Sequence, residues 1–224
     1  MKLKALIFDW AGTLIDLGSK APVAAFVEVF ADHGIEVSEA EARAPMGLPK
    51  RDHVVAMMAA IGHQGKGVSV DQVYQTFIPL SESVVARHAD LIPGALDTIE
   101  CARSHGLKIG TTTGCTRSIM DQVLPLVKAQ GFEADFVVCS DEVSEGRPAP
   151  LGIYKNLIEL GVHPTSQALK IDDTAPGIYE GLNAGCPTVG LTESGNSSAE
   201  DLSMANHLIG SVAELPALIE KYYG

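Results

Sequence analysis

Short apolar runs alternate with amphipathic stretches along most of this chain. The apolar runs have strand length and are rich in Ile, Val and Leu, as in strands that are buried on both faces of a parallel sheet. The stretches between them have apolar positions at helical spacing, and several end in a glycine, as helices often do. The expected strands are residues 3–10, 107–114, 134–140, 168–174 and 186–191. The expected helices between them are residues 94–106, 117–131, 150–161 and 175–185.

This alternation predicts an α/β fold, with a Rossmann-like parallel sheet core that helices cover on both faces. In such sheets, ligands bind at the carboxyl ends of the strands. Asp9, Thr113 and Asp173 each stand at the end of an expected strand. We therefore expect the functional site at that edge of the sheet.

Residues 17–92 do not continue the alternation, because every pattern in them is helical. The expected helices of this block are residues 21–34, 38–44, 50–62 and 69–89, with a glycine-bearing segment at 62–68. An all-helical block between the first and second strands indicates an inserted all-helical cap domain. We therefore divide the chain into a core, residues 1–16 and 93–224, and a cap, residues 17–92, with hinges at 16–19 and 89–94.

The composition narrows the choice of partners. A chain of 224 residues with 46% hydrophobic residues can bury a sizeable core, but its formal net charge of −12 argues against nucleic acid or an anionic membrane as partner. The four cysteines have no CxxC spacing, so neither a disulfide framework nor a zinc site is indicated. No signal peptide pattern opens the chain, and no apolar run has membrane-spanning length. We expect a reduced, cytoplasmic protein in which a small anionic ligand meets locally placed positive charge.

Four separated motifs carry the candidate chemistry. They are "DWAGT" after the first strand, "TTTG" after the second, "GRPAP" ahead of a helix and "DDT" after the fourth strand. In this order and spacing, with the inserted cap, the chain resembles the haloacid dehalogenase superfamily over nearly its whole length. Two further features, "FDWAGT" with Ala11 in the second acidic position and "PMGLPKRDH" in the cap, resemble the phosphonoacetaldehyde hydrolase (phosphonatase) family within it.

The superfamily resemblance implies a nucleophile and a metal. Asp9 would attack phosphorus and form an aspartyl-phosphate, which divides one hard displacement into two easier ones. A Mg²⁺ ion would neutralise the charge between the carboxylate and the phosphoryl oxygens, and a hard cation prefers oxygen ligands. The candidate ligands are the Asp9 carboxylate, the Ala11 backbone carbonyl and Asp173, with Asp172 beside them.

The same resemblance implies a phosphate-binding set. The Thr113 hydroxyl and the Gly114 N–H would hold phosphoryl oxygens, and Arg147 would supply the fixed positive charge that the transferred group requires. Thr111 and Thr112 stay open as alternatives to Thr113, because "TTTG" offers three hydroxyls.

The family resemblance also explains Ala11. A superfamily phosphatase uses a second aspartate there to protonate an alkoxide leaving group, whereas breaking a carbon–phosphorus bond would release a carbanion. A lysine can convert a neighbouring aldehyde into a protonated imine, which accepts the developing electron pair. Lys50 matches the family's imine-forming lysine. His53, one helical turn on, matches a histidine that would shuttle protons with a pKa near neutrality, and Met46 would line the aldehyde pocket.

Several residues depart from the family pattern. Gly177 stands where family members usually carry a second acid, and we expect Asp172 to compensate for it as a metal ligand. Cys115 replaces a tyrosine and Ser19 a cysteine, which would change the polarity of the pocket. Pro49 restricts the residue before it to extended geometry and would re-aim the lysine that follows.

Three functions of different classes are weighed. The first is hydrolysis of phosphonoacetaldehyde to acetaldehyde and phosphate through a lysine imine and an aspartyl-phosphate. The second is a Mg²⁺-dependent phosphatase or phosphomutase that acts on a small phosphate ester, which Ala11 disfavours. The third is a non-catalytic phosphate-binding or assembly protein, which would leave without a role the four residues Asp9, Asp173, Arg147 and Lys50. The apolar helix 21–34 and the family resemblance further predict a homodimer through the cap.

Overall fold

The computed structural model of the chain describes residues 2–16, 18–62 and 67–223. These residues form one parallel sheet of six strands in the order β3-β2-β1-β4-β5-β6. The strands are β1 (Ala5–Phe8), β2 (Lys108–Thr112), β3 (Phe136–Val138), β4 (Ala168–Asp172), β5 (Thr188–Leu191) and β6 (His207–Ile209). The expected α/β fold with a parallel sheet is confirmed.

Strand β1 occupies the centre of the sheet between β2 and β4. Its four residues are all buried, and their side chains alternate between two apolar clusters, because successive residues of a strand face opposite sides. Phe8 lies opposite Thr111 of β2 and Ile171 of β4. In this register, Asp9 and Asp172 emerge side by side at the carboxyl edge of the sheet.

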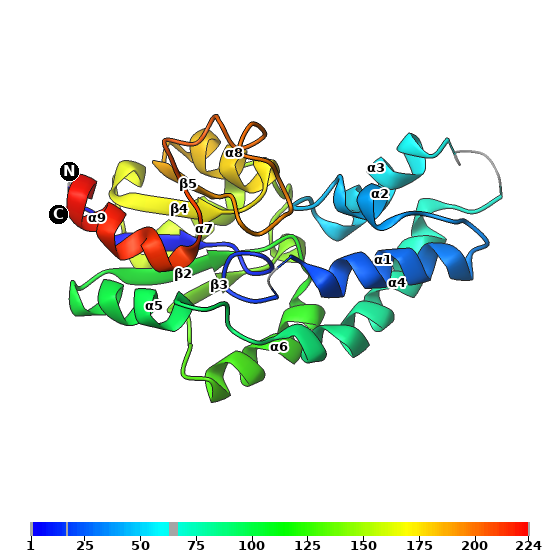
Figure 1. Cartoon of the computed structure of the whole chain (residues 1–224), viewed down its shortest axis with the longest axis horizontal. Helices are drawn as coiled ribbons and strands as arrows, with labels where there is room; N and C mark the ends of the chain where they lie inside the picture. The colour runs from blue at the N-terminus through cyan, green and yellow to red at the C-terminus, as the bar shows by residue number, and fades with distance from the viewer. Residues whose placement is uncertain (1, 17, 63–66, 224) are drawn as a thin grey trace.

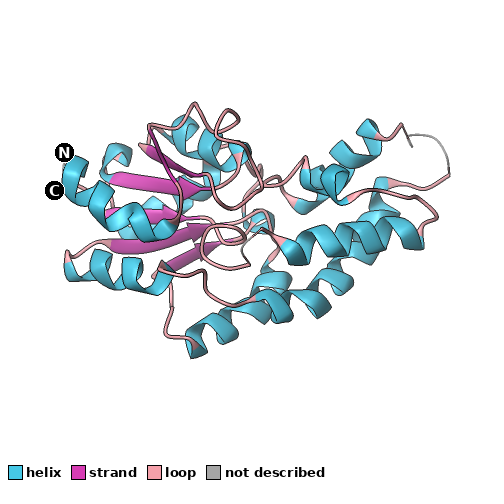
Figure 2. Cartoon of the chain, in the orientation of Figure 1, coloured by secondary structure: helices cyan, strands magenta, loops and turns pink. Residues whose placement is uncertain are grey.

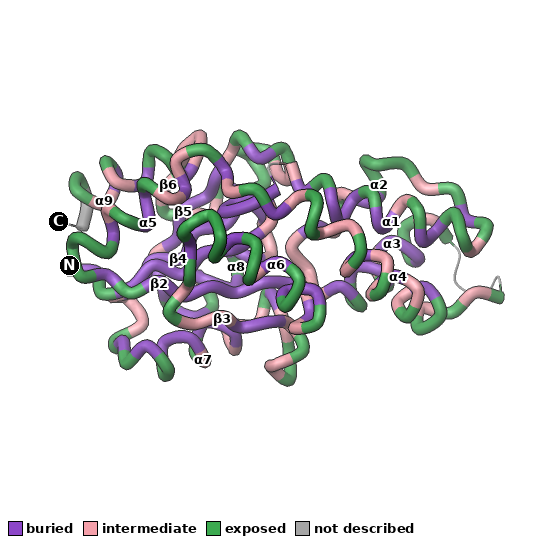
Figure 3. Tube along the Cα trace, turned by 90° about the horizontal axis from the view of Figure 1, so that it is seen from below, coloured by how far each residue is buried: buried purple, intermediate pink, exposed green. Residues whose placement is uncertain are grey.

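Helices cover both faces of the sheet (Figure 2). Side chains of α7 and α8 pack on the face that Ala5 and Ile7 share, whereas α5, α6 and α9 pack on the other face. The strands between these layers are buried along most of their length (Figure 3). The helices of the core are α5 (Ala95–Ser104), α6 (Arg117–Ala129), α7 (Leu151–Leu160), α8 (Ala175–Ala184) and α9 (Leu215–Tyr223).

The segment between β1 and α5 forms helices that stand beyond one end of the sheet (Figure 1). Phe26, Met57 and Phe77 belong to a separate apolar cluster of these helices, to which Ile119 of α6 contributes from the core. This cluster gives the cap its own hydrophobic core and joins it to α6. The cap helices are α1 (Lys20–Asp32), α2 (Glu39–Arg43), α3 (Lys50–Ala60) and α4 (Val70–Val85).

The first predicted hinge contains unusual backbone geometry. Asp16 and Ser19 both have positive φ angles, of 50° and 47°, which are uncommon outside glycine. The Asp16 carboxylate accepts the N–H groups of Lys20 and Ala21 and so caps the start of α1. Leu17 in this hinge, and residues 63–66 of the glycine-bearing segment, lie outside the described residues. The boundaries of core and cap stay a prediction.

The structure also contains elements that the sequence pattern did not predict. Strand β6 is a three-residue edge strand, and α9 follows it at the end of the chain. So short a strand gives too few positions for a periodic pattern. Single 3₁₀ turns occur at Ala86–His88, Ser140–Glu142, Thr165–Gln167 and Val212–Glu214. None of the described helices has the length and apolar composition that a membrane span requires.

Candidate active site

Three buried carboxylates meet at the carboxyl ends of β1 and β4. One oxygen from each of Asp9, Asp172 and Asp173 lies within 4.8 Å of the others. Burial, followed by the charge of Asp172, raises the pKa of Asp9. Burial, followed by the charges of Asp9 and Asp172, raises the pKa of Asp173 to about 7. Three crowded carboxylates in a buried position therefore require positive charge nearby.

Arg147 supplies part of that charge from beneath the cluster. Its Nη1 lies 2.8 Å from Asp9 Oδ1 and 3.3 Å from Asp172 Oδ2. Its Nη2 donates to the backbone carbonyl and the hydroxyl of Thr112 at 2.6 and 2.8 Å, and its Nε donates to Glu180 Oε2 at 3.0 Å. The guanidinium is thus held by several partners, so Arg147 directs a fixed charge at the Asp9 carboxylate.

Lys170 is a second buried cation, which the sequence reasoning missed. Its Nζ lies 2.9 Å from Asp172 Oδ2 and 3.3 Å from Glu180 Oε2, and it donates to Thr112 Oγ1 at 2.8 Å. Burial opposes ionisation of Asp172, but Lys170 and then Arg147 outweigh it and hold the pKa of this carboxyl below its usual value. A lysine in the middle of the apolar run of β4 was the available signal.

The residues present fit a bound divalent cation. Asp173 accepts hydrogen bonds from Thr13 Oγ1 at 3.1 Å and Asn196 Nδ2 at 2.7 Å, but no lysine or arginine in the described ranges lies within 4.0 Å of it. An oxygen-only donor set with one unneutralised carboxylate suits a hard cation. Gly12, at φ +95°, lets the loop pass this carboxylate, because a Cβ there would lie 2.2 Å from Asp173 Oδ2.

Among the three hydroxyls of "TTTG", the structure favours Thr113. The Thr112 hydroxyl is already bonded to Glu180, Arg147 and Lys170, and Thr111 lies wholly inside the sheet. Thr113 stands just beyond β2, where its Oγ1 accepts the Cys115 N–H at 3.1 Å. Its hydroxyl proton remains available to a ligand oxygen.

A loop of the cap, residues 46–50, lies directly on three core motifs. A Cβ at Gly47 would lie 2.3 Å from Thr174 Oγ1, one at Gly114 would lie 2.4 Å from the Leu48 carbonyl, and one at Gly146 would lie 2.4 Å from Pro49 Cγ. The Lys50 N–H donates to the Gly114 carbonyl at 3.2 Å. The absence of side chains at these glycines permits the approach. Pro49, which immediately precedes α3, therefore helps to place Lys50 on the core.

Lys50, His53 and Met46 are all buried where this loop enters α3. The Lys50 Nζ lies 5.9 Å from the centroid of the Phe26 ring, and no carboxylate in the described part of the chain lies within 4.0 Å of it. His53 stacks on the same ring, with centroids 3.9 Å apart, and its Nε2 donates to the Ala42 carbonyl at 2.8 Å. The Nδ1 of His53 is buried and has no hydrogen-bond partner in residues 2–16, 18–62 and 67–223.

The expected pKa of His53 near neutrality is wrong. Burial, and then the charge of Lys50, lower the pKa of His53 to about 3. The imidazole is therefore neutral at physiological pH, with a proton on Nε2 and a lone pair on Nδ1. The shared helical face of Lys50 and His53 is confirmed, because both contact Phe26.

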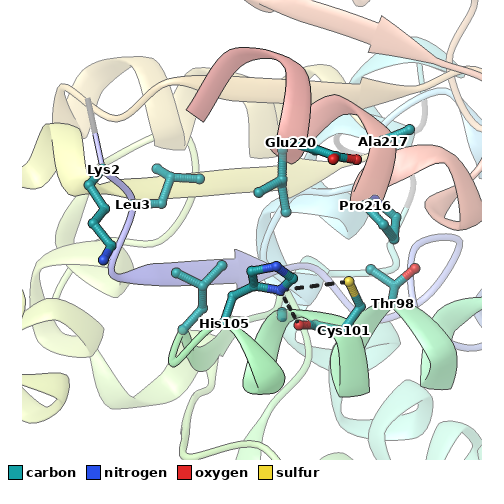
Figure 4. Close-up of a pocket in the computed structure, with 11 residues that line it drawn as sticks. Lys2, Leu3, Thr98, Cys101, His105, Pro216, Ala217 and Glu220 are labelled. Carbon is teal, nitrogen blue, oxygen red and sulfur yellow. Dashed lines mark hydrogen bonds between the residues drawn. The ribbon is translucent and has the colours of Figure 1, made fainter. Parts of the chain in front are cut away.

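A separate cavity of about 600 Å³ lies at the opposite edge of the sheet. It opens between α5 and α9, next to Leu3 and Leu107, which precede β1 and β2 (Figure 4). In it, Cys101 Sγ lies 3.9 Å from His105 Nδ1, but this nitrogen is also 2.8 Å from the Cys101 carbonyl, which can only accept a hydrogen bond. Nδ1 therefore carries its proton toward the carbonyl and is not placed to act as a base on the thiol.

Comparison with known proteins agrees with this geometry. The family described as haloacid dehalogenase-like hydrolase matches residues 6–191. A protein of Paraburkholderia phytofirmans named phosphonoacetaldehyde hydrolase is 46% identical over 205 residues, which cover 87% of this chain and 77% of that protein. This chain belongs to the phosphonoacetaldehyde hydrolase family of haloacid dehalogenase-like hydrolases.

Solved structures agree at the level of the fold. The crystal structure of a phosphonoacetaldehyde hydrolase-like protein from Oleispira antarctica is 36% identical, with a TM-score of 0.91, and the match covers 99% of this chain and 92% of that one. A β-phosphoglucomutase from Clostridium difficile superposes with a TM-score of 0.82 at 17% identity, covering 99% and 97% of the two chains, and so shows the fold alone.

Within this family, Asp172 and Gly177 are explained together. A Cβ at Gly177 would lie 1.9 Å from Asp172 Oδ2, so the Asp172 carboxylate occupies the space that a side chain at 177 would need. Thr174 donates to Asp172 Oδ1 through both its N–H and its hydroxyl. Because Arg147 and Lys170 flank the other oxygen, Asp172 anchors the two buried cations and is less available to a metal than Asp173.

Replacing Gly177 by alanine tests this packing. The added methyl group would displace the Asp172 carboxylate from Arg147 and Lys170. We expect the free energy of unfolding to fall by about 1–3 kcal/mol, as for other overpacked sites, and turnover to fall with it. Urea denaturation of Gly177→Ala, with Tyr179→Ala on the exposed face of α8 as the control, measures the effect. Equal stability of the wild type and Gly177→Ala would contradict the assignment.

The low pKa of His53 predicts a pH dependence of stability. The folded state holds this histidine neutral down to a pKa of about 3, whereas the unfolded chain protonates it below about 6.5. Protons therefore favour unfolding as the pH falls through this window, by up to about 1.4 kcal/mol per pH unit. Urea denaturation between pH 7 and pH 4 should show a shallower decline for His53→Gln than for the wild type.

The matched control for this experiment is His105→Gln, which removes an exposed imidazole. This variant should keep the steep decline of the wild type. Identical slopes for the wild type and His53→Gln would show that His53 is not held neutral by the fold.

Proposed function

We propose that this chain hydrolyses the carbon–phosphorus bond of phosphonoacetaldehyde to acetaldehyde and phosphate. The observation that carries the proposal is the position of Lys50, a buried lysine without a carboxylate partner among the described residues, which the cap loop brings onto the phosphate-binding motif at Gly114. The name of the relatives at 40–46% identity supports it. Ala11 supports it too, because its methyl group cannot protonate an alkoxide.

The first step would make the aldehyde an electron acceptor. Lys50 passes one proton to a base, and its amine then attacks the carbonyl carbon; the same proton leaves with the carbonyl oxygen as water, which gives a protonated imine. We assign these proton transfers to His53, whose Nδ1 has no hydrogen-bond partner among the described residues and which lies one helical turn from Lys50. With a pKa of about 3, this imidazole is a weak base that holds the proton only between the two transfers. Met46 and Phe26 are buried beside it and would keep water from the imine.

The second step would transfer the phosphoryl group. Asp9 attacks phosphorus, the carbon–phosphorus electron pair moves into the imine to give an enamine, and an aspartyl-phosphate forms. Arg147, already 2.8 Å from Asp9, would stabilise the negative charge that develops on the phosphoryl oxygens. Thr113 and the Gly114 N–H would donate hydrogen bonds to these oxygens. Water then cleaves the aspartyl-phosphate, and hydrolysis of the enamine through its imine releases acetaldehyde and Lys50.

We propose Mg²⁺ as the cation of the carboxylate cluster. Asp9, Asp173 and the Ala11 carbonyl would hold it, with Asp172 behind them, and it would neutralise the charge between nucleophile and phosphoryl oxygens when bound. The charge of the ion would offset the burial and the neighbouring carboxylates that raise the pKa of Asp173. The substrate would be the small anionic partner that the sequence predicts. Because the chain has a net charge of −12, we propose neither nucleic acid nor an anionic membrane as a partner.

A homodimer through the cap stays a prediction. In the structure, Phe26 and Phe30 of α1 pack inside the cap, and Val27 of α1 and Val55 of α3 stay partly exposed. These two valines mark the apolar surface available to a second cap. Light scattering on the purified protein and on a Val27→Glu variant tests the prediction, and a monomeric wild type would contradict it.

Borohydride trapping tests the function directly. Incubation with phosphonoacetaldehyde and borohydride should label Lys50 covalently, because reduction fixes an imine, and mass spectrometry of the peptide around residue 50 detects it. Lys50→Arg should be unlabelled and should lose turnover by a factor of about 10³ or more, since an arginine forms no imine here. Asp9→Asn is the matched control, because it should still be labelled at Lys50 while releasing no phosphate.

Two results would decide against this function. Full activity in Lys50→Arg would remove the imine. Faster turnover of p-nitrophenyl phosphate than of phosphonoacetaldehyde would favour the phosphatase alternative, in which general acid catalysis usually contributes about 10²–10⁴-fold and Ala11 provides none.

A further inference from the structure

A hydrogen-bond chain runs from the cap to the carboxylate cluster. Arg43, the last residue of α2, donates through Nη1 to the Gly18 carbonyl and to Asn196 Oδ1, both at 2.6 Å. Asn196 lies in the loop after β5, so this contact joins residues 153 positions apart in the sequence. The contact therefore links a helix of the cap to a loop of the core.

Asn196 continues the chain to the site. Its Nδ2 donates to Asp173 Oδ2 at 2.7 Å and to Ser19 Oγ at 2.5 Å, and the Ser19 hydroxyl donates to the Ala11 carbonyl at 3.1 Å. Each N–H or O–H group in this series meets one acceptor, and the Asn196 amide uses both of its N–H groups. The chain therefore ends on Asp173 and Ala11, which are two of the proposed metal ligands.

The orientation of the Asn196 amide depends on Arg43. A guanidinium only donates, so it must face Oδ1, and Nδ2 must then face Asp173. No carboxylate in the described ranges lies within 4.0 Å of Arg43, so its guanidinium forms hydrogen bonds to two neutral oxygens and no ion pair. An arginine placed in this way is suited to setting geometry.

We propose that Arg43 and Asn196 are positioning residues that couple docking of the cap to the geometry of the metal ligands. With the cap docked, Arg43 orients Asn196, which directs Asp173 and, through Ser19, the Ala11 carbonyl. When the cap moves away, Arg43 leaves and the amide loses the partner that orients it. Because Lys50 arrives on the same cap, the acid cluster is completed only when the imine-forming lysine is in place. This proposal rests on the proposed function for its use of Lys50.

The test is a double-mutant cycle on Mg²⁺ affinity, measured by calorimetry without substrate. Arg43→Gln and Asn196→Ala should each weaken Mg²⁺ binding by about 10-fold, as is common for residues that orient metal ligands. The double variant should bind no more weakly than the single ones, because both changes interrupt one chain. Arg43→Lys, which keeps the charge but not the forked donors, should fall between them and the wild type.

A second readout follows the cap itself. Reductive methylation of Lys50, mapped by mass spectrometry, should be faster in Arg43→Gln than in the wild type, because an undocked cap exposes this lysine. Arg51→Gln is the matched control, since it removes another cap arginine, one that forms an exposed salt bridge with Asp71. This control should keep the wild-type Mg²⁺ affinity and the wild-type rate of Lys50 methylation.

Three outcomes would overturn the coupling. In the first, Arg43→Gln binds Mg²⁺ as tightly as the wild type. In the second, the losses of Mg²⁺ affinity in Arg43→Gln and Asn196→Ala add in the double variant. In the third, the wild-type protein binds no Mg²⁺. None of these readouts contains phosphonoacetaldehyde. If the proposed function fails, the enzyme releases no phosphate from phosphonoacetaldehyde, but the double-mutant cycle still shows coupling between Arg43 and Asn196. If the coupling fails, phosphate release is normal and the double-mutant cycle shows no coupling.

Discussion

The crowding of three buried carboxylates is the constraint on which the rest of the site depends. Asp9, Asp172 and Asp173 are brought together because β1 and β4 are adjacent parallel strands in one register. Uncompensated charges in such a place would cost several kcal/mol each. Arg147 and Lys170 pair with one side of the cluster, whereas no lysine or arginine in the described ranges lies within 4.0 Å of Asp173, so the other side suits a bound cation.

The cations beneath the cluster need their own support. Glu180 and Thr112 bind both Arg147 and Lys170, which fixes two flexible side chains in a buried position. The result is a pair of fixed cations next to Asp9 and Asp172, of the kind that stabilises charge without reorganisation. Gly177 belongs to the same arrangement, since only glycine leaves room for Asp172 to meet these cations.

The cap supplies two groups that the crowded core does not contain, Lys50 and the neutral His53. Charged side chains fill the core side of the site. Lys50 and His53 lie on α3, and the loop before α3 packs against glycines of the core. Phe26 holds Lys50 and His53 in apolar surroundings, and burial there lowers the pKa of His53. In the proposed mechanism, the core therefore supplies charge stabilisation and the cap supplies the imine-forming lysine.

Periodicity by itself determined the order of strands and helices and so placed Asp9, Thr113 and Asp173 at one edge of the sheet, because parallel strands end together. The spacing of Lys50 and His53 likewise determined that they share a helical face. Only the tertiary structure decided that His53 is neutral, that Lys170 lies under the site and that Arg43 meets Asn196. Burial and contacts between distant segments set charge state and hydrogen-bond partners, and neither quantity is encoded in a local pattern.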